Sequence, residues 1–136
     1  MEKQLALHEG VRLKPYRCSA GKITIGIGRN IEENGISYPE AQMLLANDIS
    51  RVLVELSTTF HWFRNLDEVR KRVLVDMCFN LGLSRLMKFR RMLSALELGG
   101  FTTASIEMVD SRWARQVGER AKRLAKMMRT GEDDIQ

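Results

Sequence analysis

The chain has 136 residues, an apolar fraction of 44% and a net charge of +5 at pH 7. This length fits one compact domain or two small lobes that share a core, built without metal or disulfide support. A membrane-spanning helix is not expected, because no stretch approaches ~18 uninterrupted apolar residues. No secretory signal is visible at the start, so a protein whose target lies outside the cytoplasm would need another agent for its release.

The distribution of charge indicates what kind of partner the protein binds, and its two cysteines indicate the compartment in which it is made. Residues 60–130 hold fifteen basic and seven acidic side chains, a net charge of +8. Such a basic half predicts an anionic partner, either nucleic acid or an acidic polymer such as bacterial cell wall, and charge alone does not choose between them. Cys18 lies in a polar segment and Cys78 in an apolar one, so we expect no disulfide and a reduced, cytosolic origin.

The amino-terminal part is predicted to be a short helix followed by a β-hairpin. Residues 1–9 are typical of a helix that ends at Gly10, and residues 16–31 alternate with period two. Residues 19–22, Ser-Ala-Gly-Lys, supply the turn. We expect Ile23, Ile25 and Ile27 to face the core and Thr24 to point away from it, with the bare glycines at 26 and 28 allowing close approach of another group.

The remaining two thirds of the chain are predicted to be helical. Residues 37–40, Ser-Tyr-Pro-Glu, are a capping box that opens a helix over about 38–57, which would join a β lobe (about 10–38) to a helical lobe (about 60–130). A second cap at residues 65–68 precedes a helix that ends at Gly82. Further helices are expected over 86–98, 104–109 and 119–128.

A lone acid, a lone thiol and a lone hydroxyl surround the hairpin. Each is unremarkable by itself: Glu9 as a solvated residue at a helix end, Cys18 as an inert thiol, Thr24 as a β-former. Together they could address one small molecule, and an acid facing a second polar group is the minimum apparatus for cleaving a glycosidic bond. Partial burial would raise the pKa of Glu9, whereas Lys14, Arg17 or Lys22 could favour the thiolate of Cys18.

These residues and several longer strings resemble the phage-type lysozymes, the muramidases that degrade host peptidoglycan. The family pattern is glutamate, eight residues, aspartate or cysteine, five residues, threonine, which here reads Glu9, Cys18 and Thr24. The resemblance covers roughly residues 5–131. Its further matches are EGVRLKPY (9–16), TIGIG (24–28), GISYPEAQMLLANDI (35–49), LDEVRKRVLVDMCFNLG (66–82), SRW (111–113), RAKR (120–123) and RTG (129–131).

The resemblance implies an α+β, lysozyme-like fold and hydrolysis of the β-1,4 bond between N-acetylmuramic acid and N-acetylglucosamine. Glu9 would be the general acid, Thr24 would position water or sugar, and Cys18 would replace the aspartate as a thiolate base or water-orienting group. For substrate contacts it implies Phe79, Asn80 and Arg120, the last set against the catalytic glutamate. Phe79 fits a core position equally well.

Several points stay open at this stage. The segment between Arg29 and Ser37 is short, which implies a trimmed amino-terminal lobe. Arg29 stands where many members have histidine, so a lobe-stabilising ion pair known for the family cannot be assumed. A lytic transglycosylase, an inactive peptidoglycan-binding protein and a nucleic-acid-binding protein are the alternatives. We expect a monomer that binds no cofactor. Metal binding is not expected, since His8 and His61 each lack a second ligand at metal spacing. Nucleic-acid binding and membrane insertion are not expected either. It would reside in host cytoplasm before release and act on the wall in the periplasm.

Overall fold

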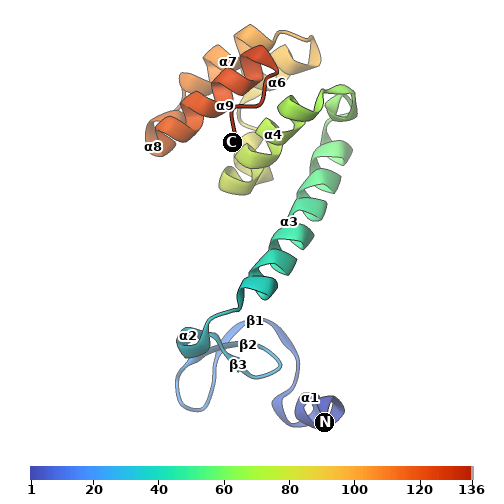
Figure 1. Ribbon diagram of the computed structural model, residues 1–136, viewed down its shortest axis with the longest axis vertical. Helices are drawn as coiled ribbons and strands as arrows, with labels where there is room; N and C mark the ends of the chain where they lie inside the picture. Colours follow the sequence, from blue (N-terminus) through green and yellow to red (C-terminus); the bar gives the residue numbers. More distant parts are fainter. Residues whose placement is uncertain (136) are drawn as a thin grey trace. The chain divides into compact units, whose positions relative to one another are not determined.

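A computed structural model describes residues 1–135, and Figure 1 labels its helices and strands. The chain divides into two compact units, Met1–Ala46 and Asn47–Gln136. Gln136, the last residue of the predicted domain, lies outside the described residues. A small antiparallel sheet followed by helices confirms the predicted α+β class. The elements are α1 (Glu2–Glu9), β1 (Arg12–Arg17), β2 (Ile23–Gly26), β3 (Arg29–Asn30), α2 (Ile31–Asn34), α3 (Tyr38–Thr59), the 3-10 helix η1 (Phe63–Asn65), α4 (Glu68–Leu81), α5 (Leu83–Leu86), α6 (Arg90–Glu97), α7 (Phe101–Val109), α8 (Arg112–Val117) and α9 (Glu119–Thr130).

The sheet of the first unit has the order β1-β2-β3, with both neighbouring pairs antiparallel. The turn between β1 and β2 begins at Cys18, whose carbonyl oxygen accepts a hydrogen bond from the N–H of Gly21 at 2.8 Å. The N–H of Cys18 in turn donates to the carbonyl oxygen of Lys22 at 2.9 Å. The predicted hairpin and its turn are therefore confirmed.

The expected facing of β2 was wrong. Thr24 is the buried residue of this strand, with 3% of its surface exposed, whereas Ile27 is 52% exposed. Two features explain the difference. Thr24 lies in the central strand, paired with Tyr16 on one side and Asn30 on the other, while α2 also packs against β2. The strand ends at Gly26, so Ile27 lies in the following turn rather than on a face of the sheet.

Helix α3 begins at the predicted capping box. The N–H of Glu40 donates to Oγ of Ser37 at 3.2 Å, and the N–H of Ser37 donates to Oε1 of Glu40 at 2.8 Å. Arg29, in β3, donates to both carboxylate oxygens of Glu40, at 2.9 and 2.5 Å. Arg29 and Ser37 together lower the pKa of Glu40 to about 2. Arg29 thus ties the sheet to the first turn of α3.

The second unit holds the hydrophobic core, whose buried apolar residues run from Val52 to Met128. Helix α9 packs against α4, α7 and α8, and α6 packs against α7 (Figure 1). The predicted helix over 86–98 is instead α5 and α6, separated by a break in which Phe89 turns onto the ring of Trp113. Within residues 1–135, no helix has the length and apolar character needed to cross a bilayer.

Candidate active site

Glu9 is the last residue of α1, and its carboxylate lies against Gly28, in the turn between β2 and β3. A Cβ placed on Gly28 would be only 2.6 Å from Oε2 of Glu9 and 2.8 Å from its Cδ. The close approach that the bare glycines predicted is therefore made by the candidate acid itself. A residue with a side chain could not occupy position 28 without displacing this carboxylate.

The burial expected for Glu9 does not come from the helix that carries it. Glu9 is exposed, and no residue of α1 is buried. The helix ends at Gly10, whose N–H donates to the carbonyl oxygen of Ala6 at 2.9 Å. Helix α1 therefore does not bury the carboxyl group of Glu9, contrary to what the sequence predicts for the junction of helix and hairpin.

Cys18 and Thr24 meet across the hairpin. Hydrogen bonds from the backbone of Lys22 and then of Ala20 do most to lower the pKa of the Cys18 thiol. Burial opposes them, and the hydroxyl of Thr24 lowers the pKa by less than burial raises it. Donors of this kind stabilise the charged form, so they favour the thiolate. The structure thus brings together two of the three residues of the predicted motif in a setting suited to an anion.

The hydroxyl of Thr24 has two candidate acceptors. Its Oγ1 lies 2.9 Å from the carbonyl oxygen of Lys22, and it also reaches the thiol of Cys18. A hydroxyl carries a single proton and can rotate to suit its partners. In the structure the hydroxyl donates to the carbonyl oxygen of Lys22.

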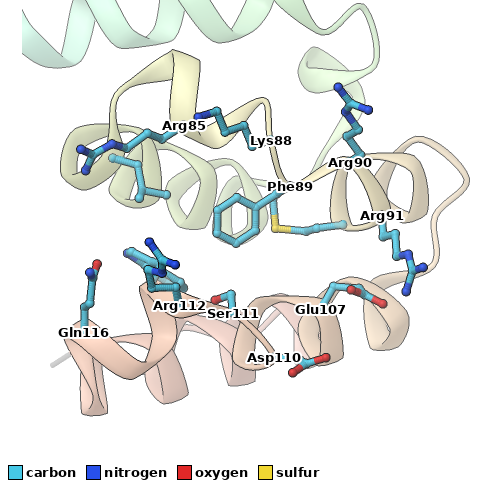
Figure 2. Close-up of a pocket in the computed structure, with 13 residues that line it drawn as sticks. Arg85, Lys88, Phe89, Arg90, Arg91, Glu107, Asp110, Ser111, Arg112 and Gln116 are labelled. Carbon is cyan, nitrogen blue, oxygen red and sulfur yellow. The ribbon is translucent and has the colours of Figure 1, made fainter.

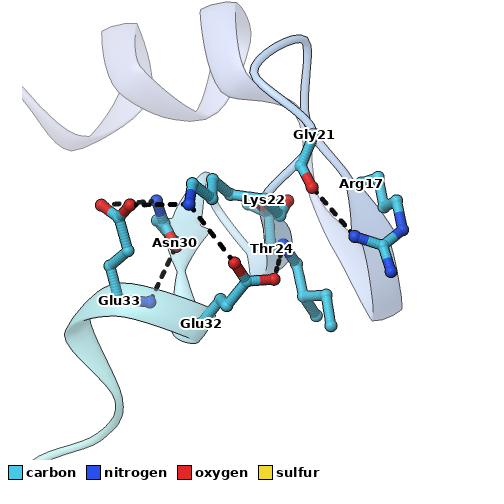
Figure 3. Close-up of polar contacts among 8 residues, drawn as sticks. Arg17, Gly21, Lys22, Thr24, Asn30, Glu32 and Glu33 are labelled. Atoms are coloured by element: carbon cyan, nitrogen blue, oxygen red, sulfur yellow. Dashed lines mark hydrogen bonds and ion pairs between the residues drawn. The ribbon is translucent and has the colours of Figure 1, made fainter.

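The basic side chains near the thiol are engaged elsewhere (Figure 3). The guanidinium of Arg17 donates to the carbonyl oxygen of Gly21 at 2.9 Å. The ammonium of Lys22 pairs with Glu33 at 3.1 Å and with Glu32 at 3.5 Å. The lowered pKa of the thiol therefore originates in backbone N–H groups of the turn and not in these cations, contrary to the expectation from sequence.

Phe79 belongs to the second unit, near the end of α4. Its side chain is 40% exposed and borders a cavity of about 530 Å³ together with charged residues of α3, among them Asp48, Arg51 and Glu55. Of the two interpretations that the sequence left open for Phe79, burial in the core is therefore wrong. The ring is available to a ligand on this face of the unit.

Asn80 and Arg120 also lie in the second unit, and each is held by a neighbour there. Oδ1 of Asn80 accepts a hydrogen bond from Nε1 of the buried Trp113 at 2.7 Å. Arg120 donates to Oδ1 of Asp76 from Nε at 2.8 Å and from Nη2 at 2.6 Å. Sequence reasoning missed both partners, because contacts 33 and 44 residues apart leave no local signal. The predicted roles of Asn80 and Arg120 toward substrate stay predictions.

Metal chemistry finds no support in side-chain geometry. Among the described residues, no group of three or more His, Cys, Asp or Glu side chains could hold a metal ion. Both cysteines are free, and burial raises the pKa of Cys78 whereas that of Cys18 is lowered.

Comparison with known proteins places these residues in a family. Residues 6–131 match the family described as phage lysozyme. A probable T4-type lysozyme 2 of Dictyostelium discoideum is 29% identical over 160 aligned positions, covering 96% of this chain and 94% of that protein. An endolysin of Acyrthosiphon pisum secondary endosymbiont phage 1 is 30% identical, covering 88% of this chain and 84% of the endolysin. The pre-baseplate central spike protein Gp5 of Enterobacteria phage T4 is 28% identical, but only 28% of its own length is covered. The chain belongs to the phage lysozyme family.

Proposed function

We propose that this protein is a lysozyme that hydrolyses the β-1,4 bond between N-acetylmuramic acid and N-acetylglucosamine in bacterial peptidoglycan. The observation that carries the proposal is the layout of one small sheet. The carboxylate of Glu9 rests on its β2–β3 turn, and the thiol of Cys18 is held by N–H donors at its β1–β2 turn, beside Thr24. Membership of the phage lysozyme family supports the same class of reaction.

Glycoside hydrolysis needs a proton donor for the leaving oxygen and a group that activates water. In our proposal the protonated carboxyl group of Glu9 gives its proton to the glycosidic oxygen as the bond to the anomeric carbon breaks. A water molecule attacks that carbon and passes a proton to the thiolate of Cys18. Thr24 orients the thiolate and the water. Exchange with solvent then returns the proton from Cys18 to Glu9, so the cycle closes.

Clearing of a cell-wall suspension tests the proposed acid. Wild-type protein should clear the suspension, and Glu9→Gln, which keeps the shape of the side chain but cannot supply the proton, should reduce the rate by a factor on the order of 10²–10⁴. Thermal melting of both proteins controls for folding. Clearing by Glu9→Gln at the wild-type rate would remove Glu9 from the mechanism.

The same assay tests the thiol. Activity should survive Cys18→Asp, because the N–H donors of the turn can hold a carboxylate, and it should fall sharply in Cys18→Ala. Cys78→Ala is the matched control, since it removes a thiol that lies in the core of the second unit. Full activity of Cys18→Ala would contradict a chemical role for this residue.

The products separate hydrolysis from its alternatives. Hydrolysis leaves reducing ends, whereas a lytic transglycosylase leaves anhydro-sugar ends that are lighter by one water. Mass spectrometry of the soluble fragments should show the heavier ends. Lighter ends would reassign the reaction to transglycosylation, and wall binding without any soluble fragment would reassign the protein to a binding role.

A further inference from the structure

A cavity of the second unit is left unused by the proposed chemistry. It has a volume of about 710 Å³ and lies between α5 and the start of α6 on one side and α7 and α8 on the other (Figure 2). In Figure 2 the ring of Phe89 stands near the centre of the cavity and Ser111 lies on the opposite side, and Trp113 is a further lining residue. The cavity therefore combines an apolar surface with a polar rim.

The charge around this cavity is strongly positive. Two acidic residues, Glu107 and Asp110, lie on the α7 side of the cavity. Within residues 1–135, none of the basic side chains at the cavity forms an ion pair with a carboxylate. Several positive groups are thus left for an anion from outside the chain. The basic residues are Arg85, Lys88, Arg90, Arg91 and Arg112.

The start of α6 adds donors to the same rim. Phe89 is its N-cap and offers no side-chain acceptor, and the first turn contains no acidic residue. Among the described residues, the N–H groups of Arg90 and Arg91 donate to no acceptor, and both residues are exposed. Placing two arginines at the positive end of a helix is unfavourable by itself, and an anion seated there would relieve it.

We infer that this cavity binds a single phosphate group carried on a sugar. Arginine forks suit phosphate oxygens, and the ring of Phe89 offers an apolar face on which a sugar can pack. Duplex DNA is disfavoured, because it brings one negative charge per ~1.7 Å and would press against Glu107 and Asp110. The source would be a phosphorylated glycan of the bacterial envelope. The site is distinct from Glu9 and Cys18, so it stands or falls independently of the proposed hydrolysis.

A titration of isotopically labelled protein with glucose 1-phosphate, followed by NMR of its amide groups, tests the inference. The largest shifts should fall on the N–H groups of Arg90 and Arg91, and glucose should produce none. The double variant Arg85→Gln, Arg91→Gln should bind about tenfold more weakly or worse, since charge-assisted hydrogen bonds are lost.

The matched control removes the same charge elsewhere. The double variant Arg115→Gln, Arg123→Gln lowers the net charge by the same amount as Arg85→Gln, Arg91→Gln, but on α8 and α9, outside the cavity. It should keep the affinity within about twofold if binding is local rather than a general effect of charge. Equal weakening in both double variants would overturn the site.

Two further probes decide the source of the phosphate. Equal affinity for inorganic phosphate would overturn the sugar contact, whereas a weaker response supports it. A contrary result is a response to phosphatidylglycerol vesicles or to a DNA duplex and none to glucose 1-phosphate. If the Arg85→Gln, Arg91→Gln variant then lost that binding, the cavity would be reassigned to lipid or nucleic acid. Clearing of cell walls is not needed as a readout, so an inactive enzyme would leave the result unaffected.

Discussion

Replacing Gly28 by alanine should displace the carboxylate of Glu9, the proposed acid, and lower activity beyond any loss of stability. The new Cβ would lie 2.6 Å from Oε2 of Glu9, whereas an ordinary contact begins near 3.4 Å, so the carboxylate must withdraw by about 0.8 Å. The side chain of Glu9 is flexible and exposed, so this withdrawal has little effect on the free energy of unfolding. A displacement near 1 Å can cost about 10²-fold in rate, which corresponds to about 2.7 kcal/mol of transition-state stabilisation.

The chain offers a matched control for the backbone effect. Gly26 has φ +72 and Gly28 has φ +74, so alanine is strained at both positions by a similar amount, on the order of 1–2 kcal/mol. A Cβ on Gly26 would meet nothing within 4 Å. Gly26→Ala should therefore share the stability loss of Gly28→Ala without moving Glu9.

The assay compares the clearing of a wall suspension per mole of folded protein, with folding measured by thermal melting. We expect similar melting temperatures for the two alanine variants and a rate about 10²-fold lower for Gly28→Ala than for Gly26→Ala. Equal rates would refute the reasoning, because they would show that the position of the Glu9 carboxylate against Gly28 has no part in catalysis.

Three further outcomes follow from contacts within single units. Thr24→Val should raise the pKa of Cys18, because it removes a hydroxyl that lowers this pKa, and Thr24→Ser, which keeps a hydroxyl, should not. The ultraviolet absorbance of the thiolate, followed against pH, measures the pKa. An unshifted titration in the valine variant would exclude the hydroxyl as a donor. The folded-state pKa of Glu40 is about 2, below its ordinary value of 4.5. Its ion pair with arginine should therefore stabilise the fold above pH 4.5 and lose that effect as pH falls toward 2. Glu40→Gln should flatten this part of a plot of melting temperature against pH, and an unchanged slope would contradict the pairing. Asn80→Ala leaves the indole N–H of buried Trp113 without its acceptor and should lower the free energy of unfolding by about 1–3 kcal/mol in denaturant titrations, with Asn80→Asp, which keeps the acceptor, as control.

Local features of this fold could be predicted because their causes lie within a few residues. The capping box of Ser37 and Glu40 and the stop at Gly82 each depend on neighbours along the chain. The turn that follows Cys18 is of the same kind. Such signals determine where elements begin and end, so the start of the helix predicted over about 38–57 and the hairpin followed directly from the sequence, while α3 itself extends to Thr59.

Contacts between distant segments could not be predicted in the same way. The carboxylate of Glu9 and the Cα of Gly28 meet although they are nineteen residues apart, and the sequence showed only that position 28 was bare. Thr24 is buried because a third strand pairs with β2, and a strand of two residues carries too short a pattern to be recognised. The partner of Arg120, Asp76, is a charged residue on a helix face like many others.

The thiol at position 18 is best understood through its donors. Three of the four hydrogen-bonding groups that lower its pKa belong to the backbone, of Lys22, Ala20 and Cys18 itself, and their directions are set by the turn rather than by any side chain. Backbone donors do not distinguish a thiolate from a carboxylate, because both are anions that accept hydrogen bonds. Donors at this turn therefore favour the anionic form of whichever residue, cysteine or aspartate, stands at position 18. Cysteine differs from aspartate mainly in its reference pKa, which is about 8.5 for cysteine and about 3.9 for aspartate. The turn and Thr24 lower the pKa of the Cys18 thiol and so reduce the difference between the two residues.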